Sequence, residues 1–376
     1  MQVLHIITSL SDGGAEAVLF RLCKFDKENN HTVISLMSEQ KYGPMLDNIG
    51  VAVHTLNFSK GKIKVSGLFQ LYRLIRQIKP DVVQTWLDHA DLIGGIVARL
   101  AGIKNIVWGV HHTDLVKGES KISTILISRI NAFLSYFVPK KIVYCAEEAK
   151  KAQEQIGYKK TKSVLVYNGY DVKDFVQNNF LGAAFRNELN ISVDTFLIGH
   201  VGRYDPQKDL PNLVEAFSLL DKKKFNFKVI IVGTNLDNNN LDLVFKLNEN
   251  NLSERIQLLG RRNDIDAVMN GIDLFVLSSL SEAFPNVLNE AMLCGTPCVT
   301  TNVGDAGKIV RDTGWVVRPK DSEALANAII KASEEKESNK SIWLQRKTAC
   351  RKRVVENFSL EKMVKEYKKV WLSEVK

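Results

Sequence analysis

The stretch L-F-V-L-S-S-L-S-E-A-F-P-N-V-L-N-E-A-M-L-C-G-T-P, residues 274–297, places an apolar run, a polar loop and a helical pattern in direct succession. The run at 274–279 has the length of a strand and ends in small polar residues, which is typical of a buried parallel strand. Pro285 suits a first helical position, and apolar residues at helical spacing continue until Gly295 and Pro297 end the pattern. The stretch predicts a strand, a loop and a helix, the repeating unit of α/β proteins.

Strand-length apolar runs alternate with amphipathic stretches along all 376 residues. This alternation predicts parallel, doubly wound sheets, and the length suits two domains that each bury a core. We expect a first domain at residues 1–170, a second at 171–357, and the break at the turn-forming N-G-Y-D, residues 168–171. A helix at 358–376 is predicted to follow, with Ser359 as its N-cap. Besides the runs at 3–10 and 274–277, the expected strands are 32–37, 51–56, 82–85, 106–110, 142–145, 164–167, 196–201, 229–232, 256–259, 298–300 and 315–317.

The helix that follows the loop begins at the carboxyl end of a strand, where a helix dipole favours a bound diphosphate. We expect the backbone amides of Asn286, Val287 and Leu288 to provide the donors. Carboxylates add acceptors for sugar hydroxyls, so Glu282 in the loop and Glu290 in the helix are expected to hold the two ends of a nucleotide sugar. The alternative interpretation is that both are solvated surface charges. Their shared setting favours a nucleotide-sugar site.

A second segment, G-H-V-G-R-Y-D-P-Q-K-D-L at residues 199–210, also lies where a predicted strand ends. Arg203 and Lys208 bring two positive charges into one loop. Negative charge builds up on a departing nucleoside diphosphate, and cations at such a position stabilise it. The alternative is a pair of ordinary surface charges.

These segments resemble the retaining glycosyltransferases of family 4, and the resemblance extends over nearly the whole chain. That family has the GT-B architecture, in which two Rossmann-like domains face a cleft and the last helix crosses back to the N-terminal domain. The resemblance implies that the first domain binds the acceptor and the second the nucleotide sugar. It implies that Glu282 contacts the transferred sugar, Glu290 the ribose, and Phe284 the donor as well. Ala283 departs from the family, which usually has glycine there.

The N-terminal half offers two further candidate segments. In S-D-G-G-A-E, Gly13 and Gly14 follow a predicted strand and would let backbone approach a ligand, although a plain Gly-Gly turn is the alternative and no dinucleotide fingerprint is present. The resemblance implies that this loop faces the donor. In I-V-W-G-V-H-H-T-D, His111 matches a family histidine near the donor sugar and the acceptor, and His112 is the second candidate. A histidine pair also suggests a metal, but no further ligand lies at a suitable spacing, so we predict none.

Two shorter patterns bear on the donor side. Asp264-Ile265-Asp266 has the D-x-D form that other glycosyltransferases use to hold a metal, but it opens a helical stretch, so we predict helix capping by residue 263 or 264. The preceding L-L-G-R-R, residues 258–262, matches the family's strand and turn for the nucleotide base, which implies a role for Arg261. Lys308 stands where the family often has glutamate.

Charge is concentrated in the first half. The chain has 51 Lys and Arg against 42 Asp and Glu, and residues 1–170 contain 22 of the basic residues against 14 of the acidic ones. In an acceptor-binding domain this surplus is expected to attract an acidic glycan or an anionic membrane that carries a lipid-linked saccharide, while a solvated basic surface without a partner is the alternative. The candidate residues are Lys60, Lys62, Lys64, Lys117, Lys121, Lys140 and Lys141.

The remaining composition indicates a cytoplasmic protein, with peripheral contact at the inner face of the cell membrane as a further expectation. The apolar stretch 122–138 is predicted to be a core helix, with a membrane-facing helix as the alternative. There is no uncharged apolar run of spanning length and no basic region before an apolar N-terminus. Five cysteines without paired short spacings suit a reducing compartment.

The sequence therefore predicts a retaining transferase that moves a hexose or N-acetylhexosamine from a UDP-sugar or GDP-sugar to a glycan or lipid-linked saccharide. We expect no metal, no cofactor and no nucleic-acid partner. Two alternatives remain, namely a nucleotide-sugar epimerase or phosphorylase on the same fold, and a non-catalytic nucleotide-sugar or glycan binder.

Overall fold

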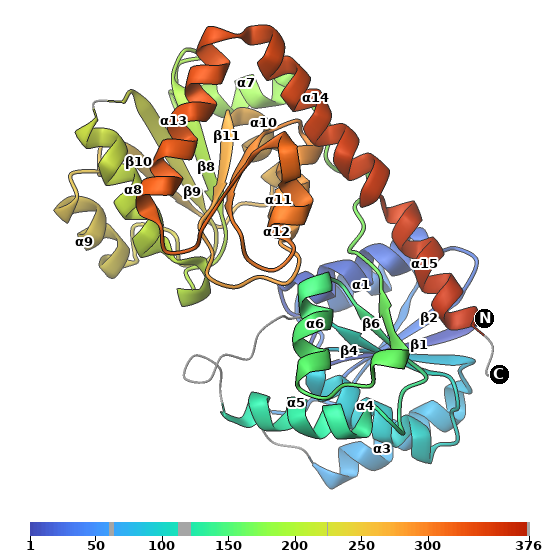
Figure 1. Ribbon diagram of the computed structural model, residues 1–376. Helices are drawn as coiled ribbons and strands as arrows, with labels where there is room; N and C mark the ends of the chain where they lie inside the picture. Colours follow the sequence, from blue (N-terminus) through green and yellow to red (C-terminus); the bar gives the residue numbers. More distant parts are fainter. Residues whose placement is uncertain (60–63, 112–121, 224, 374–376) are drawn as a thin grey trace. The chain divides into compact units, whose positions relative to one another are not determined.

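The computed structural model describes residues 1–59, 64–111, 122–223 and 225–373. The chain forms two compact units, Met1–Gly169 with Leu360–Lys376 and Tyr170–Ser359, each a parallel sheet covered by helices (Figure 1). The predicted boundary after residue 170 differs by one residue. Tyr170 belongs to the second unit, since it bridges to Ser359 and its amide donates to the Phe358 carbonyl at 3.0 Å.

The N-terminal unit contains a seven-stranded sheet in the order β3-β2-β1-β4-β5-β6-β7, in which all neighbours are parallel. Helices connect the successive strands, as the sequence predicts. The strands are β1 (Gln2–Ile7), β2 (Asn30–Ser35), β3 (Ala52–Thr55), β4 (Val82–Trp86), β5 (Ile106–Val110), β6 (Lys141–Tyr144) and β7 (Ser163–Leu165), and the helices are α1 (Gly14–Phe25), α2 (Tyr42–Asp47), α3 (Val65–Ile78), α4 (Asp88–Leu100), α5 (Ile122–Leu134) and α6 (Glu147–Gln155).

Both faces of this sheet are buried. Alternation along β1 sends Val3 and Ile7 into one apolar cluster and Leu4 and Ile6 into another. Helices α3, α4 and α5 lie side by side over the second cluster (Figure 1).

The first cluster is completed by the last helix, α15 (Leu360–Leu372), which packs on α1. The predicted apolar face is confirmed, because Met363, Tyr367, Val370 and Trp371 are all buried. The Trp371 indole donates to the Gln84 side chain at 3.2 Å, which anchors the helix to β4. The expected return of the last helix to the N-terminal domain is therefore correct.

The C-terminal unit contains a six-stranded parallel sheet in the order β10-β9-β8-β11-β12-β13. The strand order reverses between β8 and β11, and ligands of such sheets bind outside the strand ends at that reversal. The strands are β8 (Phe196–Val201), β9 (Phe227–Val232), β10 (Ile256–Gly260), β11 (Leu274–Leu277), β12 (Cys298–Thr301) and β13 (Trp315–Val317), and the helices are α7 (Asn179–Glu188), α8 (Leu210–Lys222), α9 (Leu241–Glu249), α10 (Ile265–Gly271), α11 (Asn286–Leu293), α12 (Ala306–Val310), α13 (Ser322–Ser338) and α14 (Lys340–Asn357).

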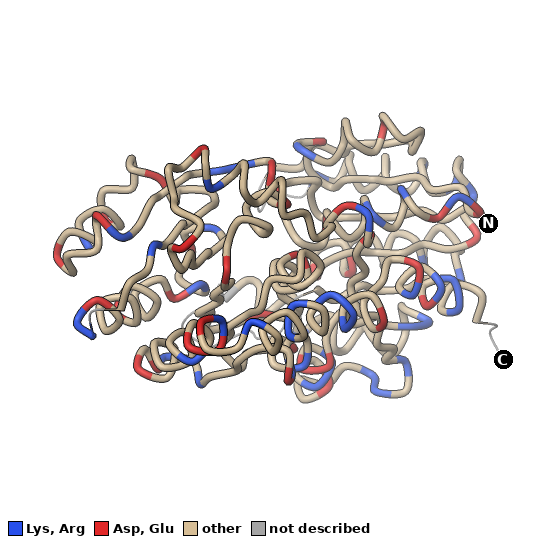
Figure 2. Tube along the Cα trace, turned by 90° about the horizontal axis from the view of Figure 1, so that it is seen from above, with Lys and Arg blue, Asp and Glu red and all other residues tan. Residues whose placement is uncertain are grey.

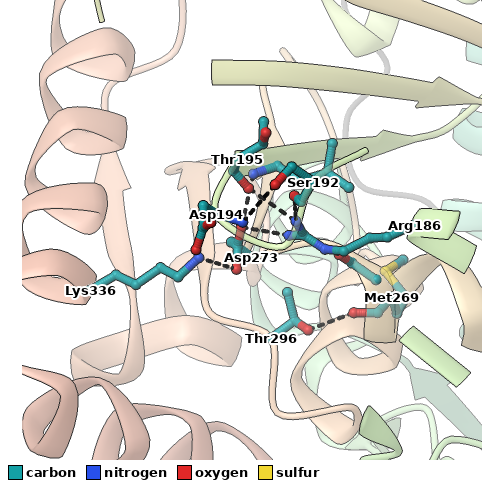
Figure 3. A network of polar contacts seen from close by, with 10 residues as sticks. Arg186, Ser192, Asp194, Thr195, Met269, Asp273, Thr296 and Lys336 are labelled. Carbon is teal, nitrogen blue, oxygen red and sulfur yellow. Dashed lines mark hydrogen bonds and ion pairs between the residues drawn. The ribbon is translucent and has the colours of Figure 1, made fainter. Parts of the chain in front are cut away.

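A polar network fixes the opposite edge of this sheet (Figure 3). Arg186 of α7 pairs with Asp273 at 2.7 Å and donates to the carbonyls of Ser192 and Thr195 at 3.0 Å. Lys336 of α13 reaches the other oxygen of Asp273 at 2.6 Å. The network joins two helices to the residue that precedes β11, so it lies at the amino-terminal ends of the strands. The loops of the candidate site lie at the opposite, carboxyl ends.

The prediction that 122–138 forms a core helix is wrong for much of its surface. In α5 and the turn after it, Leu126 is 58% exposed, Phe133 68% and Phe137 65%. Among the described helices, none is long and apolar enough to cross a membrane.

Candidate active site

Two loops meet at the reversal of strand order in the C-terminal unit. The loop after β8 contains Lys208, the loop after β11 contains Glu282, and Lys208 Nζ lies 2.5 Å from Glu282 Oε1. Both side chains are largely buried, with exposed fractions of 17% and 14%. The structure therefore brings together two residues that are 74 positions apart and that the sequence analysis assigned to one site.

Further hydrogen bonds join the same two loops. Ser278 Oγ donates to the Lys208 carbonyl at 2.8 Å, and the Leu280 amide donates to the Gln207 carbonyl at 2.7 Å. Ser279 Oγ donates to Glu282 Oε1 at 2.7 Å, so this carboxylate oxygen receives a hydroxyl and an ammonium. Charge-assisted bonds of this kind hold the carboxylate in a fixed orientation.

The loop after β12 contacts the backbone of the Glu282 loop. The Asp305 amide donates to the Ala283 carbonyl at 2.9 Å. Gly304 has φ +51°, and a Cβ there would overlap the Glu282 carbonyl oxygen and lie 2.6 Å from that of Ala283. Ala283 is not among the described residues with positive φ, which explains why alanine is tolerated where the family usually has glycine.

Arg203 differs from Lys208 in exposure. Its guanidinium is 64% exposed and lies 3.6 Å from the Asp205 carboxylate of the same loop. An exposed arginine in this position retains its ability to bind an anionic ligand, because a single long ion pair at the surface is weak.

Helix α11 begins beside Glu282, with Pro285 as its N-cap residue and not, as predicted, as its first helical residue. The Leu288 amide, one of the three predicted donors, already donates to the Pro285 carbonyl at 3.3 Å, while the amides of Asn286 and Val287 belong to the first turn of the helix. The Asn286 side chain accepts a hydrogen bond from the Tyr170 hydroxyl. The side chain of Leu288 is fully buried.

The other predicted donor contacts take different positions. Phe284 is 6% exposed and packs edge-on against Phe358, with ring centroids 5.2 Å apart, so it belongs to the core beneath the loop. Glu290 is half-buried in α11, and Arg261 is exposed directly after β10. Lys308 Nζ lies 3.3 Å from the fully buried Asp305.

The structure corrects the interpretation of the D-x-D triplet in one respect. Asp264 does occupy the N-cap position of α10, but its side chain makes no capping hydrogen bond. Its two oxygens accept from Arg262 at 2.8 and 2.6 Å, and Arg262 also pairs with Glu188. The Arg262 guanidinium lowers the pKa of the Asp264 carboxyl. An ion pair, and not a helix cap, therefore accounts for this aspartate.

Sequence analysis missed His200, which lies in β8 directly before the Arg203 loop. Its Nδ1 lies 3.0 Å from the Val276 carbonyl, so Nδ1 carries the proton and Nε2 is an acceptor. A Cβ at Gly202 would lie 3.2 Å from this Nε2, and within the described chain no hydrogen-bond partner reaches it. Burial and then the nearby Lys208 charge lower the pKa of His200 to about 4. No signal in the sequence distinguishes this histidine from an apolar strand residue.

Lowering the pH from about 7.5 to about 5 should cost the wild-type protein about 2 kcal/mol more stability than the His200→Asn variant loses. The folded-state pKa of His200 lies below the unfolded value of 6.5, so the unfolded chain takes up the proton first. Its contribution is therefore complete above the unfolded pKa and is lost as the pH falls toward 4. Urea unfolding at both pH values measures the difference, and equal losses would show that the folded protein protonates this imidazole.

In the N-terminal unit, the Gly13 loop serves an internal contact. Glu16 of α1 is 6% exposed and accepts from Ser11 Oγ at 3.1 Å and from Ser9 Oγ at 3.3 Å. A Cβ on Gly13 would overlap the Glu16 carboxylate, whereas Gly14 is exposed as the first residue of α1. Burial raises the pKa of Glu16. Glu16 is a second residue that sequence analysis did not single out.

His111 directly follows β5 and is half-buried. Its ring stacks on the fully buried Trp86, with centroids 5.0 Å apart and planes 23° from parallel. The predicted strand at 106–110 is confirmed, and it ends directly before His111. His112, the second candidate, lies outside the described residues.

A chain of polar contacts supports Trp86 from within the unit. The Trp86 indole donates to His5 Nδ1 at 3.2 Å, and His5 Nε2 lies 2.9 Å from His31 Nδ1. His31 Nε2 lies 3.2 Å from Asp26, which also pairs with Lys368 of α15 at 3.1 Å. Burial lowers the pKa of His5 well below its ordinary value. Donor atoms of His5, His31 and Cys23 are close enough to hold a metal, but this directional chain already accounts for the two imidazoles.

Only some of the lysines predicted to contact an acidic glycan or a membrane lie in the described part of the N-terminal unit. Lys64 is the exposed N-cap residue of α3, Lys140 donates to the Ser373 carbonyl, and Lys141 is half-buried at the start of β6. The others lie outside the described residues, namely Lys60, Lys62, Lys117 and Lys121. The five cysteines are all buried and form no disulfide.

Two Rossmann-like units, one with a lysine–glutamate pair at its reversal of strand order, define the GT-B class of fold. Residues 12–174 match the family model described as Glycosyltransferase Family 4, and residues 183–344 match that of Glycosyl transferases group 1. The chain belongs to the family 4 glycosyltransferases.

Named relatives agree with this assignment. The UDP-Gal:alpha-D-GlcNAc-diphosphoundecaprenol alpha-1,3-galactosyltransferase of Escherichia coli is 26% identical over 92% of this chain and 90% of its own length. The capsular polysaccharide biosynthesis glycosyltransferase CapM of Staphylococcus aureus is 27% identical over 78% and 77%. The crystal structure of Anabaena HepE in complex with UDP-glucose has a TM-score of 0.85 at 22% identity and full coverage of both chains, which shows the same fold.

Proposed function

We propose that the protein transfers a hexose or an N-acetylhexosamine from a UDP-sugar to a hydroxyl of a lipid-linked saccharide, with retention of configuration, in bacterial surface polysaccharide synthesis. The observation that carries the proposal is the contact between Lys208 and Glu282 at the reversal of strand order. The Escherichia coli relative uses UDP-Gal and a diphosphoundecaprenol-linked sugar by its name, and HepE was crystallised with UDP-glucose. Both support the choice of nucleotide, and the former supports the choice of acceptor.

In the proposed reaction, cations and backbone amides stabilise the leaving diphosphate. Lys208 and Arg203 provide the positive charge, and the first-turn amides of α11 provide hydrogen bonds. Glu282 holds the hydroxyls of the transferred sugar and Glu290 those of the ribose. The N-terminal unit contributes the Gly13–Gly14 loop and His111.

Retention follows if the bond to the phosphate oxygen breaks while the acceptor oxygen bonds to the same face of the sugar. The leaving phosphate oxygen then takes the acceptor's proton, so no enzyme carboxylate forms a covalent bond. The proposal requires no metal and no cofactor, and it places the enzyme in the cytoplasm beside the membrane that holds its acceptor.

The experiment is to incubate the protein with UDP-sugars and GDP-sugars and with diphosphoundecaprenol-linked saccharides. Mass spectrometry should detect one added hexose or N-acetylhexosamine, and NMR should show the anomeric configuration of the donor preserved. A free sugar released without an acceptor would favour an epimerase, and donor binding without release of nucleoside diphosphate would favour a binding protein. An inverted anomeric configuration in the product would show that the enzyme is not retaining, but the proposal of sugar transfer would still hold.

Arg203→Ala is expected to lower UDP release in the complete reaction about 100-fold with little change in stability, because the side chain is exposed but bears on the leaving phosphate. Arg255→Ala is the matched control, since Arg255 pairs with Asp221 at 3.1 Å and precedes β10 at the opposite edge of the sheet. Equal turnover by the two variants would remove Arg203 from the site.

A further inference from the structure

Helix α5 buries several polar side chains and leaves several large apolar ones exposed. Ser128 and Asn131 are fully buried, and so is Ser135 just after the helix. The outward positions recur at spacings of four, three and four residues, which places them on one helical face. This face, called the α5 stripe, consists of Leu126 (58% exposed), Ile130 (39%), Phe133 (68%) and Phe137 (65%).

Each of these buried polar side chains makes at least one hydrogen bond. Asn131 Nδ2 donates to the Asp88 carbonyl of α4 at 3.0 Å, and Ser128 Oγ donates to Gln153 of α6 at 3.2 Å. The Lys159 amide donates to Ser135 Oγ at 2.9 Å. Hydrogen bonds therefore contribute to the packing of α5 on its neighbours, and the apolar side chains of the stripe remain exposed.

The end of the stripe is held rigidly. Lys162 Nζ donates to the carbonyls of Ser135, Tyr136 and Pro139 at 2.9, 2.8 and 2.7 Å, which closes the turn after α5. The rings of Phe133 and Phe137 lie 5.5 Å apart on this turn. Two exposed aromatic rings on a fixed turn form a preorganised apolar surface, which a monomeric soluble protein seldom presents without a partner.

Helix α3 presents a similar face on the same side of the sheet (Figure 1). Val65 and Phe69 are 69% and 65% exposed, and Tyr72 follows on the same face at 39%. Arg73 and Arg76 are exposed on this helix.

The charged residues of both helices have a single sign. The sequence has no Asp or Glu in residues 48–80 or in residues 120–146, which include α3 and α5. Elsewhere basic and acidic positions are interspersed along the trace (Figure 2). Arg129 is exposed beside the α5 stripe, and Lys159 Nζ lies 4.8 Å from the centre of the Tyr136 ring. Helices that expose apolar side chains and whose own charged residues are all cationic are complementary to a surface with an apolar interior and anionic headgroups.

We propose that the α5 stripe, together with the exposed face of α3, docks the N-terminal unit on an anionic lipid bilayer, with Phe133 and Phe137 entering the apolar boundary. A second copy of the chain fits less well. A symmetric dimer through the stripe would bring Arg129 and Lys159 toward the same residues of its partner, and like charges in contact oppose association. The choice of a bilayer rests on the proposed function, because a lipid-linked acceptor resides in one.

The experiment measures flotation of the full chain with phosphatidylcholine vesicles that contain or lack phosphatidylglycerol. The wild-type protein should float with the anionic vesicles and not with the neutral ones, and high salt should release it. The double variant Phe133→Ser/Phe137→Ser is expected to lose about tenfold in vesicle affinity. Arg129→Gln should weaken binding by a smaller factor. Transfer to a water-soluble acceptor analogue should remain unchanged in all of them.

Phe180→Ser/Phe245→Ser is the matched control, because these side chains are 84% and 61% exposed on α7 and α9 of the other unit. It should float as the wild type does. Undiminished flotation of the Phe133/Phe137 variant would overturn the inference. So would a wild-type dimer in sedimentation that this variant dissociates, since a second copy would then cover the stripe. Flotation involves no sugar donor, so a protein that does not float would refute the docking surface but not the transfer reaction. A protein that floats but transfers no sugar would refute the proposed function but not the docking surface.

Discussion

Lys208→Met is expected to lower kcat/KM for sugar transfer about 1,000-fold, the largest effect of any single substitution proposed for this enzyme. The ammonium of Lys208 is largely buried at the reversal of strand order, so no water-exposed cation can take its place. Charge that develops on the leaving phosphate would then lose its strongest electrostatic partner. Steady-state UDP release with a lipid-linked acceptor measures the effect.

A loss of folding must be separated from a loss of chemistry. Lys336→Met is the matched control, because Lys336 pairs with Asp273 at 2.6 Å with similar burial but at the opposite edge of the same sheet. Lys208→Met should lose about 1–2 kcal/mol of unfolding free energy, since it leaves the partly buried Glu282 carboxylate without its lysine. Lys336→Met should lose less, because Arg186 still pairs with Asp273. Only Lys208→Met should lose activity. Adding Glu282→Gln to it should restore stability but not transfer, and recovered transfer would assign Lys208 to structure alone.

Gly304→Ala is expected to destabilise the C-terminal unit by about 3 kcal/mol or more and to lower transfer at least about 100-fold. The new methyl group would overlap the Glu282 carbonyl oxygen, and the backbone at φ +51° disfavours any side chain. Relief of this overlap requires the Glu282 loop to move, and the carboxylate moves with it.

Gly50→Ala separates the two causes of that loss. Gly50 has φ +80°, but a Cβ there meets open space, so only the backbone term of about 1 kcal/mol applies. Urea unfolding and UDP release should show a small stability loss and full activity for this control. Equal behaviour of the two variants would mean that the overlap at Gly304 is relieved without moving Glu282.

Strand positions were predictable because a strand buried on both faces of a parallel sheet appears in the sequence as a short, continuous apolar run. The predicted strands at 106–110, 196–201, 274–277 and 315–317 coincide with β5, β8, β11 and β13, and the others shift by only a few residues. The same logic failed for α5, where apolar residues were assumed to face inward. The inner face of α5 includes the polar Ser128 and Asn131 because Gln153 and Asp88 present hydrogen-bonding groups to them, and those groups belong to elements distant in sequence.

The site could be predicted in part for a similar reason. Lys208 and Glu282 each follow a strand, and the carboxyl ends of β8 and β11 meet at one edge, so their contact follows from topology. His200 and Glu16 could not be found this way. Both residues were recognised because their side chains are buried next to a loop of the candidate site. Such burial depends on tertiary packing and not on the spacing of residues in the sequence. Capping by residue 263 or 264 was predicted from the sequence pattern, but the Asp264 side chain makes no capping bond because Arg262, two residues earlier, takes its carboxylate.

The hydrogen bond from the Tyr170 amide to Phe358, together with the bridge to Ser359, means that the chain leaves and re-enters the N-terminal unit at a single place. Topologically, residues 170–359 are an insert whose two ends are tied together, and both chain termini belong to the host. Exchanging the insert for that of a relative would require only two splice points, which lie side by side and outside either sheet. If the proposed donor site and the proposed docking surface are correct, the first belongs to the insert and the second to the host, so the two could be inherited separately.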